Sequence, residues 1–194
     1  MVAGVCVPAG GREVLAGLGV RDSKTLSDAQ AERLARAVRE AYPTAVVAIG
    51  PERYNALYAK MGNLNRLLAW AHARVIENLL EQTPGCQEAV SDQFGDARLL
   101  ERALLERGRR ISLTQRPRAE SDPVVAAASI VARAEFLRRL AALARRFATP
   151  LPKGAGPPVL AAGRAFVARH GAQALAQVAK LHFRTTQQVT GAGA

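Results

Sequence analysis

Hydrophobic residues are spaced along the chain in a way that predicts strands alternating with helices. Short apolar runs bounded by turn residues predict strands over residues 1–8, 44–50, 88–94 and 110–116. Helical periodicity predicts helices over residues 26–42, 51–62, 63–80, 96–108 and 121–147, followed by a loop over 149–158 and two short helices. This alternation indicates an α/β fold in which helices pack on a β-sheet.

Local signals mark several helix ends. Ser27 and Gln30 have the spacing of a capping box. Gly62 and Gly108 are expected to close the helices that precede them. One apolar stripe of the helix over 63–80 is expected to face the core, and it consists of Leu64, Leu67, Leu68, Ala71, Val75 and Leu79.

The composition fits one globular domain, because 49% of the 194 residues are apolar. No apolar run reaches the roughly 18 residues of a membrane span, so no membrane partner is expected. The first residues lack the basic segment of a signal peptide. Cys6 and Cys86 are far apart in the sequence and outside any CxxC motif, which indicates reduced, buried thiols in a cytoplasmic protein.

The charge is unevenly distributed between the two halves of the chain. Residues 1–97 hold 10 Lys+Arg and 11 Asp+Glu, a net charge of −1, whereas residues 98–194 hold 17 and 5, a net charge of +12. A basic half on a globular chain favours a polyanionic partner such as nucleic acid. The alternative is an arginine-rich surface that is only solvated.

Carboxylates are expected to gather at one end of the sheet. Asp92 ends one predicted strand, and Glu120 and Asp122 lie where the next strand meets the long helix. Clustered oxygen ligands without His or Cys favour Mg²⁺ or Mn²⁺, and a pair of such ions can cleave a phosphodiester. The alternatives are a turn residue at Asp92 and a helix N-cap at Asp122, which Pro123 at the first helical position favours.

Six segments, in their order and spacing, resemble ribonuclease HIII, the bacterial type 2 ribonuclease H that cuts RNA in RNA–DNA hybrids: GVRDSKTLS, PERYNALYAKMGNLNRLLAWAHARVI, SDQFG, RAESDPVVAAASIVARAEFL, LPKGAG and AKLHFRTT. The AES before AAASI is similar to HIII rather than HII, which carries Asp at that place. The resemblance implies a ribonuclease H-like mixed β-sheet flanked by helices, with a C-terminal helical extension. It implies that Asp92 and Glu120 are catalytic and bind Mg²⁺ or Mn²⁺, and that the products carry 5′-phosphate and 3′-hydroxyl ends.

The resemblance also implies that the catalytic domain over residues 1–189 lacks its first, central strand, with residues 190–194 as a flexible tail. Family members supply two further metal-binding carboxylates from that strand, as an Asp-Glu pair. We therefore expect a monomer with impaired cleavage, in which the strands at 1–8 and 88–94 pair directly or leave bare edges. Two alternatives stay open: a non-catalytic remnant that binds hybrids, and a basic nucleic-acid-binding module.

The resemblance suggests further contacts with the RNA–DNA hybrid, each with a plainer alternative. The loop before the first helix could equally be a solvated cap, and Asn63 could simply cap the long helix. Arg133 lies one helical turn past Ser129 and could aim at a phosphate. His182 is expected to be structural. The predicted substrate-binding residues are Asp22, Ser23, Lys24, Asn63, Asn65, Ser129, Arg133, Lys153 and Gly154.

Overall fold

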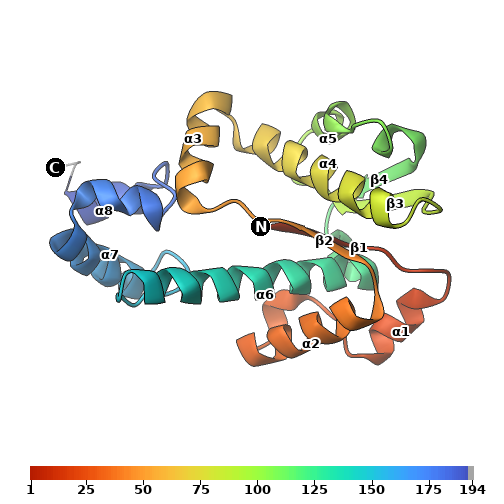
Figure 1. The fold of residues 1–194 in the computed structure, drawn as a ribbon, viewed down its shortest axis with the longest axis horizontal. Helices are drawn as coiled ribbons and strands as arrows, with labels where there is room; N and C mark the ends of the chain where they lie inside the picture. Colours follow the sequence, from red (N-terminus) through yellow and green to blue (C-terminus); the bar gives the residue numbers. More distant parts are fainter. Residues whose placement is uncertain (192–194) are drawn as a thin grey trace. The chain divides into compact units, whose positions relative to one another are not determined.

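The computed structural model describes residues 1–191, and these form two compact units (Figure 1). The first unit comprises Met1–Ala48 and Asn63–Phe136, and the second comprises Ile49–Gly62 and the chain from Leu137 onward. The single catalytic domain expected over residues 1–189 stays a prediction.

The first unit contains all four strands that the structure describes. Its strands are β1 (Val2–Val5), β2 (Thr44–Val47), β3 (Glu88–Asp92) and β4 (Ser112–Arg116). Its helices are α1 (Gly11–Gly17), α2 (Asp28–Ala41), α4 (Leu64–Gln82), α5 (Ala97–Ala103) and the start of α6 (Pro123–Arg146). Three short 3-10 turns complete it: η1 (Ser23–Thr25), η2 (Gly108–Arg110) and η3 (Ala119–Ser121). The predicted α/β alternation is confirmed.

The strands form two separate pairs within this unit. β1 pairs with β2 in antiparallel register, Val2 opposite Val47, and β3 pairs with β4 in parallel register, Asp92 opposite Arg116. Among the described residues, β1 and β3 do not pair with each other. We expected β1 and β3 either to pair directly or to have unpaired edges. The structure shows the second arrangement.

The β1–β2 pair lies between helices on both faces (Figure 1). Because side chains alternate along a strand, Val2 and Ala45 pack on α4, whereas Val5 packs on α2 and the start of α6. The packing of β1 on α4 is especially close at Gly4, where an added Cβ would lie 2.7 Å from Val75 Cγ1.

A Gly4→Val variant is expected to lower the free energy of unfolding by about 1–3 kcal/mol, because the new side chain has to push α4 away from the strand. Gly17→Ala is a matched control, since an added Cβ there meets no atom within 4 Å. Urea unfolding of both variants measures the difference, and equal stabilities would contradict the close packing of β1 on α4.

Helix α4 buries two faces rather than the one predicted stripe. Leu67, Ala71 and Val75 are buried as expected, but Ala73 is buried too and packs against Leu100 of α5. The prediction missed the second face because small alanines on it carry little periodic signal.

The prediction that Gly108 closes helix α5 is wrong. The helix ends at Ala103, and Gly108 begins η2. Its N–H donates to the buried Glu77 carboxylate over 2.7 Å, and an added Cβ would lie 3.0 Å from Glu77 Oε1. This glycine therefore permits a close approach of backbone to carboxylate. Local caps were predicted correctly elsewhere, since the Ser27 capping box and the left-handed Gly62 are both present.

The second unit is helical. It consists of α3 (Pro51–Met61), the end of α6, α7 (Pro157–His170), η4 (Ala172–Gln177) and α8 (Arg184–Thr190). Asn55 of α3 joins distant segments, because its amide donates to the carbonyls of Ala176 and Ala179 and accepts from the N–H of Leu181. No helix among residues 1–191 is long and apolar enough to cross a membrane.

Two sequence expectations fall in this unit. His182 stacks on Tyr58 with 4.2 Å between ring centroids and packs at a tilt against Phe183 with 4.1 Å, which gives this histidine a packing role. Thr190 belongs to α8 and Gly191 caps it, so the expected tail does not start at residue 190; residues 192–194 lie outside the described part of the chain.

Candidate active site

Asp92 ends strand β3 and is fixed by the turn that follows β4. Its Oδ1 accepts the backbone N–H of Ala119 over 3.0 Å. The turn is tight because Arg118 adopts the left-handed conformation with φ 55°, which is uncommon for a residue with a Cβ. Backbone strain of this kind concentrates at functional sites. The Asp92 carboxylate thus lies against the residue that directly precedes Glu120.

Glu120, in η3, meets a lysine from a distant part of the chain. Lys24 Nζ lies 3.3 Å from Glu120 Oε1. A hydrogen bond from its own backbone N–H and the Lys24 ammonium group together lower the pKa of Glu120. Glu120 in turn raises the pKa of Lys24, with smaller contributions from Asp22 and Asp92. Glu120 and Lys24 therefore form an ion pair, and Asp22 and Asp92 lie near enough to add to the electrostatic field at the ammonium group.

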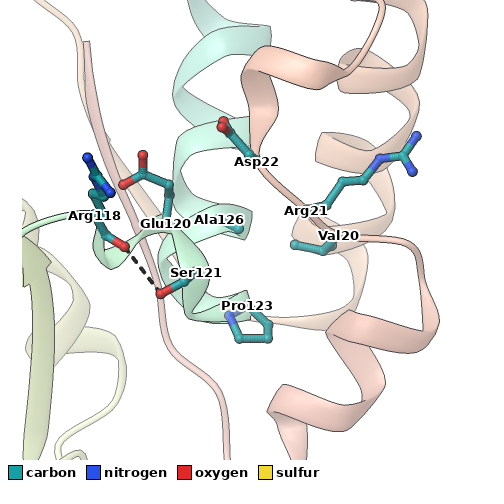
Figure 2. A pocket seen from close by; sticks show the side chains of 8 residues that line it. All are labelled: Val20, Arg21, Asp22, Arg118, Glu120, Ser121, Pro123 and Ala126. Carbon is teal, nitrogen blue, oxygen red and sulfur yellow. Dashed lines mark hydrogen bonds between the residues drawn. The ribbon is translucent and has the colours of Figure 1, made fainter.

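Asp22 and Glu120 line one pocket beside η3 (Figure 2). Asp22 lies close enough to Glu120 to raise its pKa against the stronger lowering effects. The Arg118 carbonyl, in the same wall, accepts the Ser121 hydroxyl over 3.2 Å. Of the three carboxylates, Asp22 and Glu120 thus line this pocket, and Asp92 does not.

Asp122 has a structural role, as its N-cap interpretation predicted. Its Oδ1 accepts the N–H of Val124, and its Oδ2 lies 3.4 Å from Arg12 Nε and 3.2 Å from Arg116 Nη2. Buried between two guanidinium groups, this carboxylate is committed to charge pairing. In residues 1–191, no three Asp, Glu, His or Cys side chains are placed to hold a metal ion together.

The loop before α2 is held by protein contacts. Asp22 caps η1 through the Lys24 N–H over 2.9 Å, as the cap alternative predicted. Arg133, which we expected to aim at a phosphate, donates to the Ser23 carbonyl and to Asp28 Oδ1. Its guanidinium ties η1 to α2, and the substrate contact expected of Arg133 stays a prediction.

The remaining predicted contacts are divided between the units. Asn63 caps α4, since its Oδ1 accepts the N–H of Asn65 over 2.8 Å. Asn65 packs beside Gly95, just past β3, where an added Cβ would lie 2.8 Å from Asn65 Nδ2. Ser129 is half-buried on α6. Lys153 and Gly154 are exposed in the second unit, in the loop between α6 and α7.

Comparison with known proteins assigns the family. A family model described as ribonuclease HII matches residues 1–186. The chain belongs to the ribonuclease HII family. Within this family, its curated relatives carry the name ribonuclease HIII, so the resemblance read from the sequence is confirmed.

The chain matches only part of each relative. It is 46% identical over 171 residues to ribonuclease HIII of Chlamydia pneumoniae, which is 88% of this chain and 57% of the relative. It is 41% identical over 190 residues to that of Protochlamydia amoebophila, 98% of this chain and 63% of the relative. Bst-RNase HIII, solved in complex with Mn²⁺, superposes with a TM-score of 0.89 at 32% identity, over 98% of this chain and 63% of that chain. The chain thus spans about three fifths of the length of these proteins.

One residue of this ribonuclease HII family member was missed by the sequence prediction. His72 of α4 is half-buried near Asp92, where its Nδ1 is 3.3 Å from the Ser91 hydroxyl and its ring packs on Phe94. Burial lowers the pKa of His72 to about 4, although the nearby Asp92 acts in the opposite direction. A single histidine on an apolar helix gave no signal beyond core packing.

The stability of the protein is expected to fall as the pH drops from about 6.5 to about 4. In this range the unfolded chain protonates His72 while the folded chain keeps it neutral, so the unfolded state binds more protons. The loss amounts to about 3 kcal/mol at the acid end. Urea unfolding of the unchanged protein and of His72→Gln across this range isolates the effect, since a common slope in both would rule out His72 as its source.

Proposed function

We propose that this chain is the catalytic part of a ribonuclease H that hydrolyses the RNA strand of RNA–DNA hybrids with divalent metal ions. The observation that carries the proposal is the contact between Asp92 and the Ala119 N–H, which sets Asp92 beside Glu120. The family match and the ribonuclease HIII relatives support the reaction and the substrate.

The donor chemistry of the site fits Mg²⁺ or Mn²⁺. Asp92 and Glu120 offer hard carboxylate oxygens, which these ions prefer. A bound ion would activate water for attack at the phosphate and stabilise the leaving oxygen. Asp92 is held in position by the Ala119 N–H, and Glu120 stays ionised because Lys24 and its own backbone lower its pKa.

Binding of the hybrid is proposed to use the basic half of the chain and the loops beside the acids. Lys24, Asn63 and Asn65 lie in the same unit as Asp92, and Lys153 and Gly154 are exposed in the other. A net charge of +12 over residues 98–194 favours a polyanion. The affinity should therefore fall steeply with salt, as counterions are released from neutralised phosphates.

Residues 1–194 alone are expected to cleave a hybrid weakly, because two carboxylates do not fix the geometry of two ions. The test compares this chain with a form that carries an added N-terminal strand bearing an Asp-Glu pair, on a hybrid labelled in its RNA strand and with Mn²⁺. The proposal expects 5′-phosphate and 3′-hydroxyl products, with much faster cleavage by the extended form.

The other outcomes separate the alternatives. Binding of the hybrid without cleavage by either form would indicate a non-catalytic remnant. Equal binding of hybrid, double-stranded DNA and single strands, again without cleavage, would indicate a basic nucleic-acid-binding module. Equal cleavage by both forms would show that other residues of this chain complete the site.

A further inference from the structure

The two cysteines, which are 80 positions apart in the sequence, both belong to the first unit. Val2 and Gly4 of β1 face α4. Val2 packs with Ala71 and Val75, whereas Gly4 lies against Val75 and Leu79, which are closer to the C-terminal end of α4. Cys6 is the next residue with this orientation, because strand side chains alternate. The progression along α4 brings Cys6 to the end of the helix.

Cys86 lies just beyond the C-terminal end of α4. Helix α4 ends at Gln82, and the turn after it is closed by a hydrogen bond from the Cys86 N–H to the Thr83 carbonyl over 3.1 Å. The Cys86 thiol donates to the Glu88 carbonyl over 3.3 Å. Cys6 is fixed as firmly, since its N–H donates to the Pro43 carbonyl over 3.0 Å. Both cysteines are free and half-buried.

The electrostatics agree with this placement. Burial raises the pKa of the Cys86 thiol, the hydrogen bond to the Glu88 carbonyl lowers it, and the nearby Cys6 thiol raises it further. Such an interaction requires neighbouring sulfur groups. The sequence analysis expected reduced, buried thiols, and both are free but half-buried rather than buried.

We propose that Cys6 and Cys86 form a reversible disulfide that ties the end of β1 to the start of β3. Cys6 directly follows β1, and Cys86 precedes β3 by two residues, so the bond would link strands that do not pair with each other in the described chain. It would close a loop of 80 residues, which strongly restricts the unfolded chain.

The oxidant is a low-molecular-weight disulfide such as oxidised glutathione. One cysteine loses its proton to water and attacks a sulfur atom of the oxidant, whose S–S bond breaks to release one thiol. The second cysteine then attacks the mixed disulfide and releases the second thiol. Two protein thiols are oxidised, and one small disulfide is reduced to two thiols. A raised pKa of Cys86 makes the reaction faster at pH 8 than at pH 7.

The test incubates the whole chain with oxidised glutathione at pH 8 and follows free thiols, intact mass and non-reduced peptides. We expect both thiols to disappear without a retained glutathione, a single peptide pair joining Cys6 to Cys86, and a melting temperature raised by roughly 5 °C. Dithiothreitol should reverse all three. Unreacted thiols, stable glutathione adducts or links between two chains would each overturn the proposal.

A matched variant shows whether the fold, rather than mere flexibility, brings the thiols together. In Cys6→Ser/Val7→Cys the thiol moves by one residue to the opposite side of the strand, since Val7 packs against the α2 and α6 core. We expect this protein to keep a glutathione adduct and form the internal bond at least tenfold more slowly. The same comparison in urea should abolish the difference, and an equal rate in the folded proteins would contradict the placement of Cys6 beside Cys86.

Discussion

An Asp92→Asn variant is expected to cleave an RNA–DNA hybrid at least ~100-fold more slowly than the same protein with Asp92, in whichever form of the chain is active. Loss of an outer-shell partner already costs 10–100-fold in metal sites, and we propose that Asp92 is a direct ligand. The amide keeps an oxygen that can accept the Ala119 N–H, so the turn after β4 should survive. Rates are measured with Mn²⁺ on a hybrid labelled in its RNA strand.

The control for this variant lies on the same strand. Glu88→Gln removes one negative charge at the exposed start of β3, four residues from Asp92. Its rate should equal that of the unchanged protein, and the melting temperatures of all three should agree. A hundredfold loss of activity in Glu88→Gln as well would indicate that cleavage depends on the overall negative charge near β3. An Asp92→Asn variant that kept its activity would show that Asp92 is not a catalytic residue.

Replacing Glu77 with alanine is expected to lower the free energy of unfolding by about 3 kcal/mol. The Glu77 side chain is 5% exposed and accepts two backbone N–H groups, that of Gly108 over 2.7 Å and that of Arg107 over 3.2 Å. Its loss leaves these donors without an acceptor, and an unsatisfied buried donor costs about 1–3 kcal/mol. Urea unfolding monitored by circular dichroism measures the change.

Glu81→Ala, one turn further along α4 and exposed, serves as the control and should change stability by less than about 0.5 kcal/mol. Glu77→Gln should fall between the two, because its amide oxygen can still accept one of the N–H groups. A Glu77→Ala protein as stable as Glu81→Ala would show that solvent reaches η2 and replaces the carboxylate.

Signals that act within a few residues could be read from the sequence. Ser27 and Gln30 form their capping box and Asn63 caps α4, because each side chain meets backbone three or fewer positions away. The order of strands and helices followed from periodicity in the same way. These features depend mainly on residues close together in the sequence.

Features that depend on distant partners could not be read. Gly108 has every mark of a helix cap, yet its place is decided by Glu77, 31 positions earlier. The contacts of Arg133 with Ser23 and Asp28 join residues more than 100 positions apart, and no local pattern predicted them. The ion pair between Lys24 and Glu120 also depends on residues far apart in the sequence, so no local pattern predicted it.

The contact between Lys24 and Glu120 means that the Glu120 carboxylate already has a cation beside it. The Lys24 ammonium group lies 3.3 Å from Glu120, and the fields of Asp22 and Asp92 also favour its charged form. A divalent ion that binds Glu120 would therefore have to displace the Lys24 ammonium group. The affinity measured for such an ion would report an exchange of one cation for another, and the released lysine side chain would then be available to a substrate phosphate.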